Sequence, residues 1–389
     1  MKKVLFFFLF TFSFFVPAFT QDNCTLRISL LTCAPGEELY STFGHTAIRV
    51  QDNSTGVDDV YNYGTFEFDE DFYSKFVRGK LLYALSVSSF NEFIYQYQVE
   101  SRSVVEQELS LTCPQKEQLL AALRTNALPQ NRSYRYDFLF DNCTTRAGDM
   151  VDSTSGANVV FRNLLPPDPL TFRDHIDVYL NKANQDWSQL GIDLLLGAKM
   201  DREASNEEAM FLPDNLMIAF DSAIADNKPL VAAKRTILEM PSVASESLAI
   251  TPVVAFSILF AIFAMLTFTK KPWSGKLLAA LDFILFFLLG LVGVLLVFMW
   301  FGTDHALCAN NYNLLWALPT NLAAAFVVHK KLAWVKRYFG IVFWLTILLL
   351  VTWFFLPQRM NNAFLPLVLT IALRSWMLSK QTRNANKRI

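Results

Sequence analysis

The sequence predicts an exported α+β domain followed by an all-α membrane domain of five transmembrane helices. A short apolar segment follows two lysines at the start of the chain, and the composition changes sharply near residue 245. Residues 21–245 have an ordinary globular composition, whereas residues 249–378 are almost entirely apolar. The net charge is −1 over 389 residues. Because no basic stripe marks the soluble part, we expect no nucleic-acid partner.

Residues 1–20 have the features of a secretory signal peptide. Met1-Lys2-Lys3 is a positively charged start, and residues 4–16 form a short apolar core. Cleavage after Thr20 would place Ala18 at the −3 position, which suits a signal peptidase. Threonine fits the −1 position poorly, so an uncleaved anchor is the alternative. In both cases we expect the following domain to be exported.

The exported domain, residues 21–245, alternates strand and helix patterns. The predicted strands cover residues 25–32, 45–50, 60–66, 81–87, 103–111 and 134–140. A polar turn over residues 51–59 makes the second and third strands a hairpin. A helix is expected from about Pro114 to Asn126, with proline in its first turn. Beyond residue 208, we expect amphipathic helices that lead to the membrane.

Cys143 stands where a predicted strand gives way to a predicted helix. The strand from Tyr134 to Phe140 runs into Asp141-Asn142-Cys143, and residues 144–151 continue as a helix. The unpaired N–H groups at a helix start lower the pKa of a thiol and favour the nucleophilic thiolate. Arg146, one turn on, would add positive potential. The alternative is a small buried core cysteine.

A cysteine nucleophile needs a base, and His45 is the best-placed candidate. It begins a strand-like run directly after a glycine. The chain has only four histidines. His175 lies in a charged segment that we expect to be exposed, and His305 and His329 fall among the membrane segments. We therefore predict that His45 activates Cys143. The alternative is a structural histidine in an ordinary strand.

Asn62 lies on the return strand of the hairpin, next to the strand that begins with His45. A third polar group commonly orients the histidine of such a site. Tyr61 and Tyr63 compete for this role, and strand packing alone is the alternative for all three.

The exported compartment is oxidising, so the remaining cysteines matter. A nucleophile at Cys143 must stay unpaired. That leaves Cys24, Cys33 and Cys113 for at most one disulfide, and their spacing does not select the pair. No metal-ligand cluster and no phosphate-binding glycine loop is present in the sequence, so we expect no cofactor.

Five apolar stretches predict a membrane domain over residues 246–380. They cover residues 249–268, 277–301, 313–328, 338–356 and 362–378. Most are long enough to cross the hydrocarbon core of a bilayer. With the soluble domain outside, every cytoplasmic segment carries lysine or arginine, including the tail of residues 381–389. The outer loops contain only Arg359 as a basic residue, which matches the positive-inside rule.

The first outer loop is a candidate substrate-binding region. Its polar and aromatic residues lead into an apolar helix at the depth of the outer leaflet. Polar groups at membrane depth are costly and often mark a site. The candidate residues are His305, Asn311, Asn313 and Trp316. The alternative is an interfacial aromatic belt with helix caps.

Two motifs and the domain order resemble a known family. Phe43-Gly44-His45 is followed much later by Asn142-Cys143-Thr144-Thr145-Arg146 and then by the five predicted membrane helices. This pattern resembles the Lnb family of lipoprotein N-acyltransferases of Bacteroides-type bacteria. The soluble part is similar to circularly permuted papain-like domains of the NlpC type, in which the histidine strand precedes the cysteine helix. Lecithin:retinol acyltransferase belongs to that permuted group.

The resemblance implies an acyltransferase of the bacterial inner membrane with its catalytic domain in the periplasm. Cys143 would take an acyl chain from a phospholipid as a thioester, with His45 as the base. The acceptor would be the N-terminal diacylglyceryl-cysteine of a lipoprotein. One alternative is a membrane-tethered cysteine peptidase or amidase that acts on peptidoglycan, although it would need only one membrane anchor. Another is a receptor or assembly factor that binds lipid or peptide without catalysis.

Overall fold

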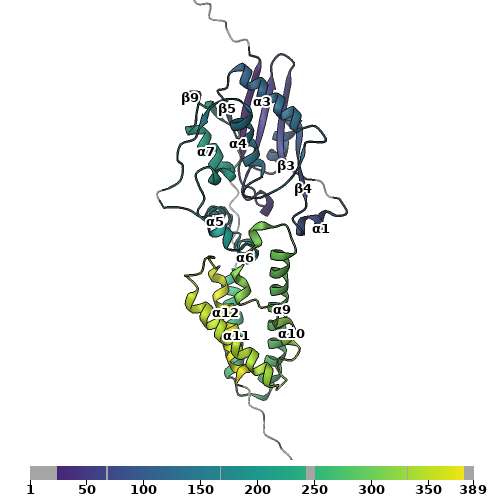
Figure 1. Ribbon diagram of the computed structural model, residues 1–389, viewed down its shortest axis with the longest axis vertical. Helices are drawn as coiled ribbons and strands as arrows, with labels where there is room; N and C mark the ends of the chain where they lie inside the picture. Colours follow the sequence, from purple (N-terminus) through teal and green to yellow (C-terminus); the bar gives the residue numbers. More distant parts are fainter. Residues whose placement is uncertain (1–23, 67–68, 167, 242–249, 331, 381–389) are drawn as a thin grey trace, which may run out of the picture.

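The computed structural model describes residues 24–66, 69–166, 168–241, 250–330 and 332–380. A sheet-containing domain stands at one end of an elongated molecule and a bundle of helices at the other (Figure 1). The expected α+β domain followed by a helical membrane domain is therefore confirmed. The predicted signal peptide, residues 1–20, and the tail of residues 381–389 lie outside the described residues.

The first domain is built on a seven-stranded antiparallel sheet of order β10-β5-β1-β2-β3-β4-β6. Its strands are β1 (Leu26–Cys33), β2 (His45–Asp52), β3 (Val57–Thr65), β4 (Leu82–Ser89), β5 (Val104–Leu109), β6 (Ser133–Arg135) and β10 (Val231–Leu238). Each predicted strand has a counterpart, but the one expected over residues 134–140 ends at Arg135. Beyond it the backbones of Asp137 and Asp141 bond to each other in both directions, at 3.0 and 3.1 Å, so the chain turns before Cys143.

Residues 231–238 correct the expectation that helices alone lead to the membrane. They form β10, an edge strand that pairs with β5. Most of their side chains are exposed. The sequence therefore lacks the alternation of apolar and polar residues that predicts a strand. Lys234 pairs with Asp221, and Arg235 pairs with Glu106 of β5. An edge strand obtains its stability from backbone pairing on one side, so its apolar pattern is weak.

Helices cover both faces of the sheet. On one face lie α3 (Cys113–Asn126), α4 (Cys143–Thr154) and α7 (Pro213–Ser222), and on the other lies α2 (Phe90–Val99). Successive side chains of each strand point to opposite faces of the sheet, so they pack against different helices. Leu30 of β1 joins the core beneath α3 and α4, whereas its neighbour Leu31 joins the core beneath α2.

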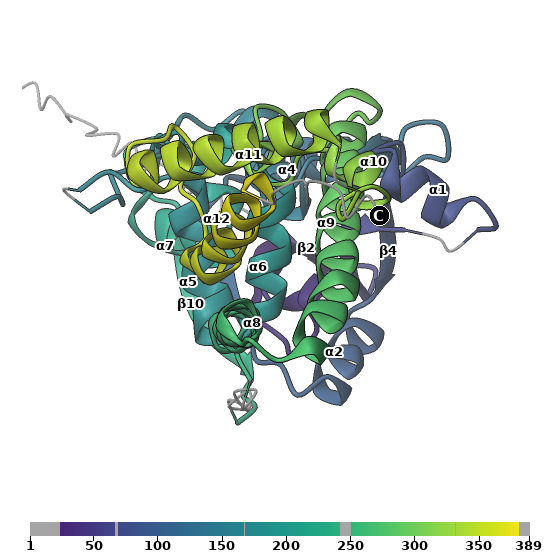
Figure 2. The same ribbon diagram turned by 90° about the horizontal axis from the view of Figure 1, so that it is seen from below.

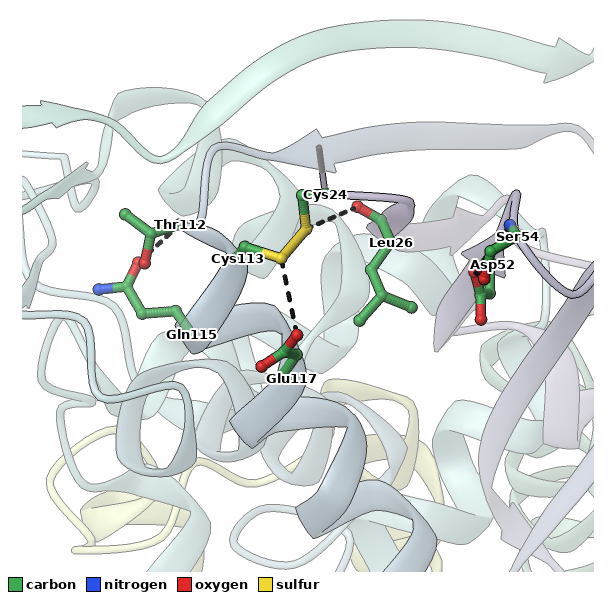
Figure 3. The surroundings of a disulfide bond; sticks show 8 residues. All are labelled: Cys24, Leu26, Asp52, Ser54, Thr112, Cys113, Gln115 and Glu117. Atoms are coloured by element: carbon green, nitrogen blue, oxygen red, sulfur yellow. Dashed lines mark hydrogen bonds between the residues drawn. A yellow bond between two sulfur atoms is a disulfide. The ribbon is translucent and has the colours of Figure 1, made fainter. Parts of the chain in front are cut away.

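A disulfide joins Cys24, just before β1, to Cys113 at the start of α3 (Figure 3). Thr112 caps that helix and exchanges hydrogen bonds with Gln115. Among the described residues, Cys33, Cys143 and Cys308 are free cysteines. The pairing that the sequence left open is thereby settled.

The chain between α4 and β10 builds a short layer next to the membrane domain. This layer contains α5 (Phe172–Lys182), α6 (Asp186–Leu195), η2 (Ala198–Asp201) and η3 (Glu208–Phe211). Figure 1 shows α5 and α6 between the sheet and the helix bundle. His175, expected to be exposed, is buried on α5 against the ring of Phe211. The charged neighbours that suggested exposure are themselves paired: Arg173 is buried against Asp193 and Asp201, and Asp174 pairs with Arg359.

A small three-stranded sheet adjoins the main one. It consists of β7 (Val159–Val160), β8 (Ile224–Ala225) and β9 (Lys228–Pro229). Two further short elements of the first domain are η1 (Leu39–Ser41) and α1 (Phe72–Val77).

The membrane domain contains α8 (Pro252–Phe268), α9 (Pro272–Phe301), η4 (Ala306–Cys308), η5 (Tyr312–Leu315), α10 (Asn321–Ala325), α11 (Ala333–Thr352), η6 (Asn362–Phe364) and α12 (Leu365–Ser379). Three helices among the described residues are long and apolar enough to cross a membrane, namely Pro272–Phe301, Ala333–Thr352 and Asn362–Ser379. α8 is also apolar but has only 17 residues.

The third predicted membrane helix, residues 313–328, is not continuous. The chain there forms η5, a turn and the five-residue helix α10. Pro319 removes a backbone donor, and Asn313 bonds to backbone outside the segment, so both interrupt the helix. The third of the five predicted membrane segments is therefore broken into short pieces rather than forming one helix.

Close backbone contacts seat the first domain on the membrane domain. Gly197 N donates to Leu307 O at 2.9 Å, and Ala198 N donates to Asn310 O at 3.1 Å. A Cβ atom on Gly197 would lie 2.0 Å from Ala309 O, so this approach requires glycine. Arg359, before η6, pairs with Asp174 and Asp177 of α5. The outer loops and the α5–α6 layer therefore form one joined interface.

Candidate active site

Cys143 is the first residue of α4, and its position is fixed by the residue before it. The Oδ1 atom of Asn142 accepts hydrogen bonds from Thr144 N at 2.7 Å and Thr145 N at 2.9 Å, which caps the helix. Its Nδ2 atom donates to Phe138 O and Phe211 O. Asn142 is buried. The Asn142 side chain accepts from the N–H groups of Thr144 and Thr145 but not from that of Cys143. The Cys143 N–H has no hydrogen-bond acceptor among the described residues and is free to bind a ligand oxygen.

His45 is the first residue of β2 and lies opposite Cys33 of β1. The preceding Gly44 has φ +80°, and a Cβ atom there would lie 2.8 Å from Cys33 O. A larger residue would push the start of β2 away from β1. The glycine before His45 is therefore needed to hold the imidazole at the end of this strand.

The sheet opens where the start of α4 approaches it. The pairing of β2 with β3 ends at Ile48 and Tyr61, so His45 and Gly64 lie beyond the last paired residues. A Cβ atom built on Gly64 would lie 3.5 Å from the Cβ atom of Cys143 and 4.0 Å from Cε1 of His45. The cysteine and the histidine therefore meet at the same backbone position of β3.

Hydrogen bonds fix the imidazole between two partners. His45 Nε2 lies 2.6 Å from Oδ1 of Asn62 on β3. The Cys143 thiol is the other partner of the ring, because charge and hydrogen bonding between the two groups shift both pKa values. With Nε2 next to Asn62, Nδ1 is the ring nitrogen that remains for the thiol. The structure thus brings Cys143, His45 and Asn62 together in the order thiol, imidazole, amide.

The thiol and the imidazole shift each other's pKa. Burial raises the pKa of Cys143, but the charge of His45, its hydrogen bond, the Thr46 N–H and the Thr144 hydroxyl outweigh burial and lower it to about 7. Burial lowers the pKa of His45, and the charge and hydrogen bonds of Cys143 and Asn62 raise it overall. Both side chains are partly exposed, so a substrate can reach them. The pair favours a thiolate beside an imidazolium near neutral pH.

Two threonines connect the elements that carry this pair. Thr46 Oγ1, next to His45, lies 3.2 Å from Thr144 Oγ1, next to Cys143, and both residues are buried. This bond keeps the start of β2 in register with the start of α4. The sequence did not reveal Thr46, because a threonine in a strand has no distinctive spacing. Asn142 could have been found, since asparagine before a predicted helix is a standard capping signal.

Arg146 contributes less positive potential than the sequence suggests. Its guanidinium forms a double hydrogen bond with Asp141, at 2.5 and 2.9 Å, and stacks over the ring of Tyr134 at 3.5 Å. The carboxylate compensates its charge close by, so Arg146 mainly braces α4 against β6.

The four outer-loop candidates lie at the interface between the domains. Asn311 Nδ2 donates to Leu194 O and Leu195 O at the end of α6, and Asn313 Nδ2 donates to Asp193 O and Leu194 O. Trp316 Nε1 donates to Asn313 Oδ1, and both side chains are buried. In the part of the chain that the structure describes, none of these three side chains hydrogen-bonds to Cys143, His45 or Asn62.

His305 differs from the other three candidates. Its side chain is only partly buried, and its Nε2 atom lies 3.0 Å from Phe76 O, near the end of α1. Leu307 of the same loop packs against the hydrophobic cluster around Phe172 and Phe211, as Phe43 and Phe138 also do. Phe43 is two residues from His45, so this cluster connects the outer loop with the strand start that carries His45.

Comparison with known families agrees with this domain order. The family model described as "Lnb N-terminal periplasmic domain" matches residues 19–178, and the model described as "Lnb transmembrane domain" matches residues 244–385. No curated protein and no solved structure matches the chain. The first match contains Cys143, His45 and Asn62, and the second contains the helices of the membrane domain. The chain therefore belongs to the Lnb family, with a periplasmic domain followed by a transmembrane domain.

Proposed function

We propose that the protein is a lipoprotein N-acyltransferase of the bacterial inner membrane. It would move an acyl chain from a phospholipid to the N-terminal amine of a diacylglyceryl-cysteine lipoprotein. The observation that carries the proposal is the contact of Cys143 with His45, and of His45 with Asn62, in an Lnb-family chain. The first domain contacts the loops of the membrane domain directly, which supports a reaction on two substrates that both lie in the membrane rather than on one soluble substrate.

In the first half-reaction, the Cys143 thiolate attacks the carbonyl carbon of a phospholipid ester. The free N–H of Cys143, at the start of α4, would stabilise the negative charge that develops on the carbonyl oxygen. The C–O bond then breaks, and the proton held by His45 passes to the departing alcohol oxygen. The products are an S-acyl enzyme and a lysophospholipid.

In the second half-reaction, the lipoprotein amine attacks the thioester carbonyl. Neutral His45 takes a proton from the attacking nitrogen, and the C–S bond breaks to regenerate the thiolate. The product is an N-acyl lipoprotein. Asn62 holds the ring so that Nδ1 faces the sulfur in both steps. Of the outer-loop candidates, the partly buried His305 is proposed to meet the lipid-borne substrates. Asn311, Asn313 and Trp316 are buried, so their proposed contribution to substrate binding is to hold the outer loop against α6.

The test uses the full-length protein in vesicles with a phospholipid that carries a labelled acyl chain. Label should appear on the protein, be released by neutral hydroxylamine as thioesters are, and disappear in Cys143→Ser and His45→Ala. Cys308→Ser is the matched control, because Cys308 is another free cysteine and lies in the outer loop. Mass spectrometry of lipoprotein N-termini then reports the transfer itself. Normal N-acylated product from Cys143→Ser would refute the mechanism.

The same experiment separates the proposal from a peptidoglycan peptidase or amidase. Such an enzyme would cleave peptide substrates and acquire no acyl label from phospholipid. Cleavage of peptidoglycan fragments without S-acylation would therefore replace the proposed function with this alternative.

A further inference from the structure

The helix α1 exposes large apolar side chains on the first domain. Tyr73 is 74% exposed, Phe76 51% and Val77 43%. Leu82, at the start of β4, is also exposed. A helix of six residues is too short to be stable alone, so the buried ring of Phe72 holds it to the domain while its other apolar side chains face outward. A cluster of this kind on a soluble surface marks a contact surface for lipid or protein.

The position of α1 relative to the membrane follows from its contacts with the end of α9. α9 is the longest apolar helix and ends at Phe301, which is 73% exposed. A few residues later, Asp304 N donates to Arg78 O at 2.9 Å, directly after α1. His305 Nε2 lies 3.0 Å from Phe76 O. Since α9 leaves the apolar layer at Phe301, α1 lies at the height of the outer membrane surface.

The side of α1 that faces the membrane is not covered by the described helices. Figure 2, which looks along the molecule from the membrane-domain end, shows α1 beside α9 and α10 rather than behind them. The space beneath α1 is therefore outside the helix bundle, where the lipid of the adjacent leaflet lies.

Two exposed cations at the end of α1 suit a phospholipid surface. The exposed Arg78 directly follows the helix, and the exposed Lys80 comes two residues later. Lys75 of α1 pairs with Asp69, which precedes the helix together with the exposed Glu70 and Asp71, so the cations available to phosphate are those at its end. Aromatic and apolar side chains flanked by cations are typical of interfacial helices, whose rings enter the headgroup region while lysine and arginine contact phosphate groups. Basic residues close to a bilayer also gain from its negative surface potential.

A row of aromatic contacts connects this surface with the candidate active site. The ring centroids of Phe76 and Phe72 are 6.1 Å apart, those of Phe72 and Phe66 are 5.5 Å apart, and those of Phe66 and Tyr83 are 5.2 Å apart. Tyr83 stacks on Tyr136 at 4.3 Å. Tyr136 and Cys143 pack against the same core cluster, and the charge of Cys143 acts on the Tyr136 hydroxyl. The row thus runs from the membrane surface to the neighbourhood of the thiol.

We propose that α1 is a phospholipid-binding surface that dips into the outer leaflet beside α9, and that the aromatic row guides an acyl chain from it to Cys143. The guiding step rests on the proposed acyltransferase function, whereas the lipid contact of α1 does not. The occupant is a phospholipid of the adjacent leaflet, held by apolar contact with Tyr73, Phe76 and Val77 and by its phosphate on Arg78 or Lys80.

The contact is tested by photocrosslinking in the full-length protein. A benzophenone amino acid replaces Phe76 in one variant and Val160 in another, in vesicles of phosphatidylethanolamine and phosphatidylglycerol that contain an alkyne-tagged phospholipid. Val160 is 56% exposed in β7, and Figure 1 shows β9 of that small sheet far from the helix bundle. Lipid crosslinking several-fold stronger at 76 than at 160 supports the proposal. Equal crosslinking, or crosslinking at 76 to protein instead of lipid, overturns it.

The guiding step is tested with matched charge insertions. Val77→Glu should raise the KM for vesicle phospholipid about tenfold, leave kcat similar, and leave Cys143 alkylation by a soluble reagent unchanged. Val160→Glu should change none of the three. An unchanged KM in Val77→Glu overturns the guiding role. Lipid crosslinking at 76 without any S-acylation of the parent protein would instead refute the acyltransferase function and keep the lipid surface.

Discussion

His45 Nε2 lies 2.6 Å from Asn62 Oδ1, so one edge of the imidazole is already occupied by an amide carbonyl. Because that oxygen can only accept, Nε2 must carry a hydrogen, and Nδ1 is the nitrogen that exchanges a proton with Cys143. The asparagine therefore selects both the orientation and the tautomer of the base. Neither effect requires Asn62 to touch a substrate.

Replacing Asn62 with alanine should lower kcat about 10- to 100-fold, because the imidazole loses its fixed orientation relative to the thiol. The KM for phospholipid should change little, since Asn62 contacts the base rather than the lipid. Steady-state transfer with vesicle phospholipid measures both quantities. Asn53→Ala, in the turn that follows β2, is the control. A kcat within twofold of the parent would mean that strand packing alone explains Asn62.

The rate of Cys143 alkylation should rise with pH through a midpoint near 7. The pKa of the thiol is lowered to about 7, so the reactive thiolate is scarce below this pH and dominant above it. The thiolate–imidazolium form should be lost at higher pH, where His45, whose pKa is raised, gives up its proton. Transfer that depends on this form should follow a bell-shaped pH profile.

The variant His45→Ala should move the alkylation midpoint upward. It removes the charge and the hydrogen bond that lower the pKa of the thiol, while much of the burial that raises it remains. Second-order rates with iodoacetamide across pH 5 to 10 provide the measurement, with the test range set by the ordinary pKa values of His and Cys. An unchanged midpoint would show that the helix start alone activates Cys143.

The interface between the domains should depend on Gly197. A Cβ atom there would lie 2.0 Å from Ala309 O, so Gly197→Ala must displace backbone and should destabilise the full-length protein by about 1–3 kcal/mol. Gly191 is the matched control, because its Cβ atom would meet nothing within 4 Å. Alanine should stabilise α6 there by up to about 1 kcal/mol. Thermal unfolding in detergent compares the Gly197→Ala and Gly191→Ala variants. Equal melting temperatures would contradict the close backbone contact between Gly197 and Ala309.

Loss of the disulfide should weaken the first domain without altering the chemistry. The bond between Cys24 and Cys113 closes a sequence separation of 89 residues, and its removal in Cys113→Ser should cost about 2–5 kcal/mol. Alkylation of Cys143 at low temperature should stay normal, because the site is built from other elements. Chemical unfolding in oxidising buffer measures the loss, and an unchanged unfolding midpoint would argue that the bond is dispensable.

The sequence predicted the proximity of Cys143, His45 and Asn62 better than it predicted the interface between the domains. Cys143 at a helix start and His45 at a strand start follow from local patterns, namely a capping residue and a glycine before an alternating run. Their proximity was also predicted, because the chain has only four histidines and His45 was the best placed of them relative to Cys143. The β2–β3 hairpin was likewise visible from its polar turn and gave the position of Asn62.

The errors have a common physical origin in contacts between distant segments. β10 appears polar because an edge strand relies on backbone pairing with β5. His175 appears exposed because its partner Phe211 is supplied by a later segment. Asn313 marks a break in the third membrane segment because its amide bonds to the end of α6, more than a hundred residues earlier. No local pattern encodes such partners.

The edge strand β10 also decides where the first domain can be cut. The family match to the periplasmic domain ends at residue 178, but β5 obtains its outer neighbour only from residues 231–238, and Gln107 obtains its partner Asp221 from α7. A fragment ending at residue 178 would expose a full-length sheet edge and leave a buried amide without its acceptor, a combination that promotes aggregation. The smallest fragment of this chain that folds alone must therefore include β10, which ends about sixty residues after the end of the matched periplasmic domain.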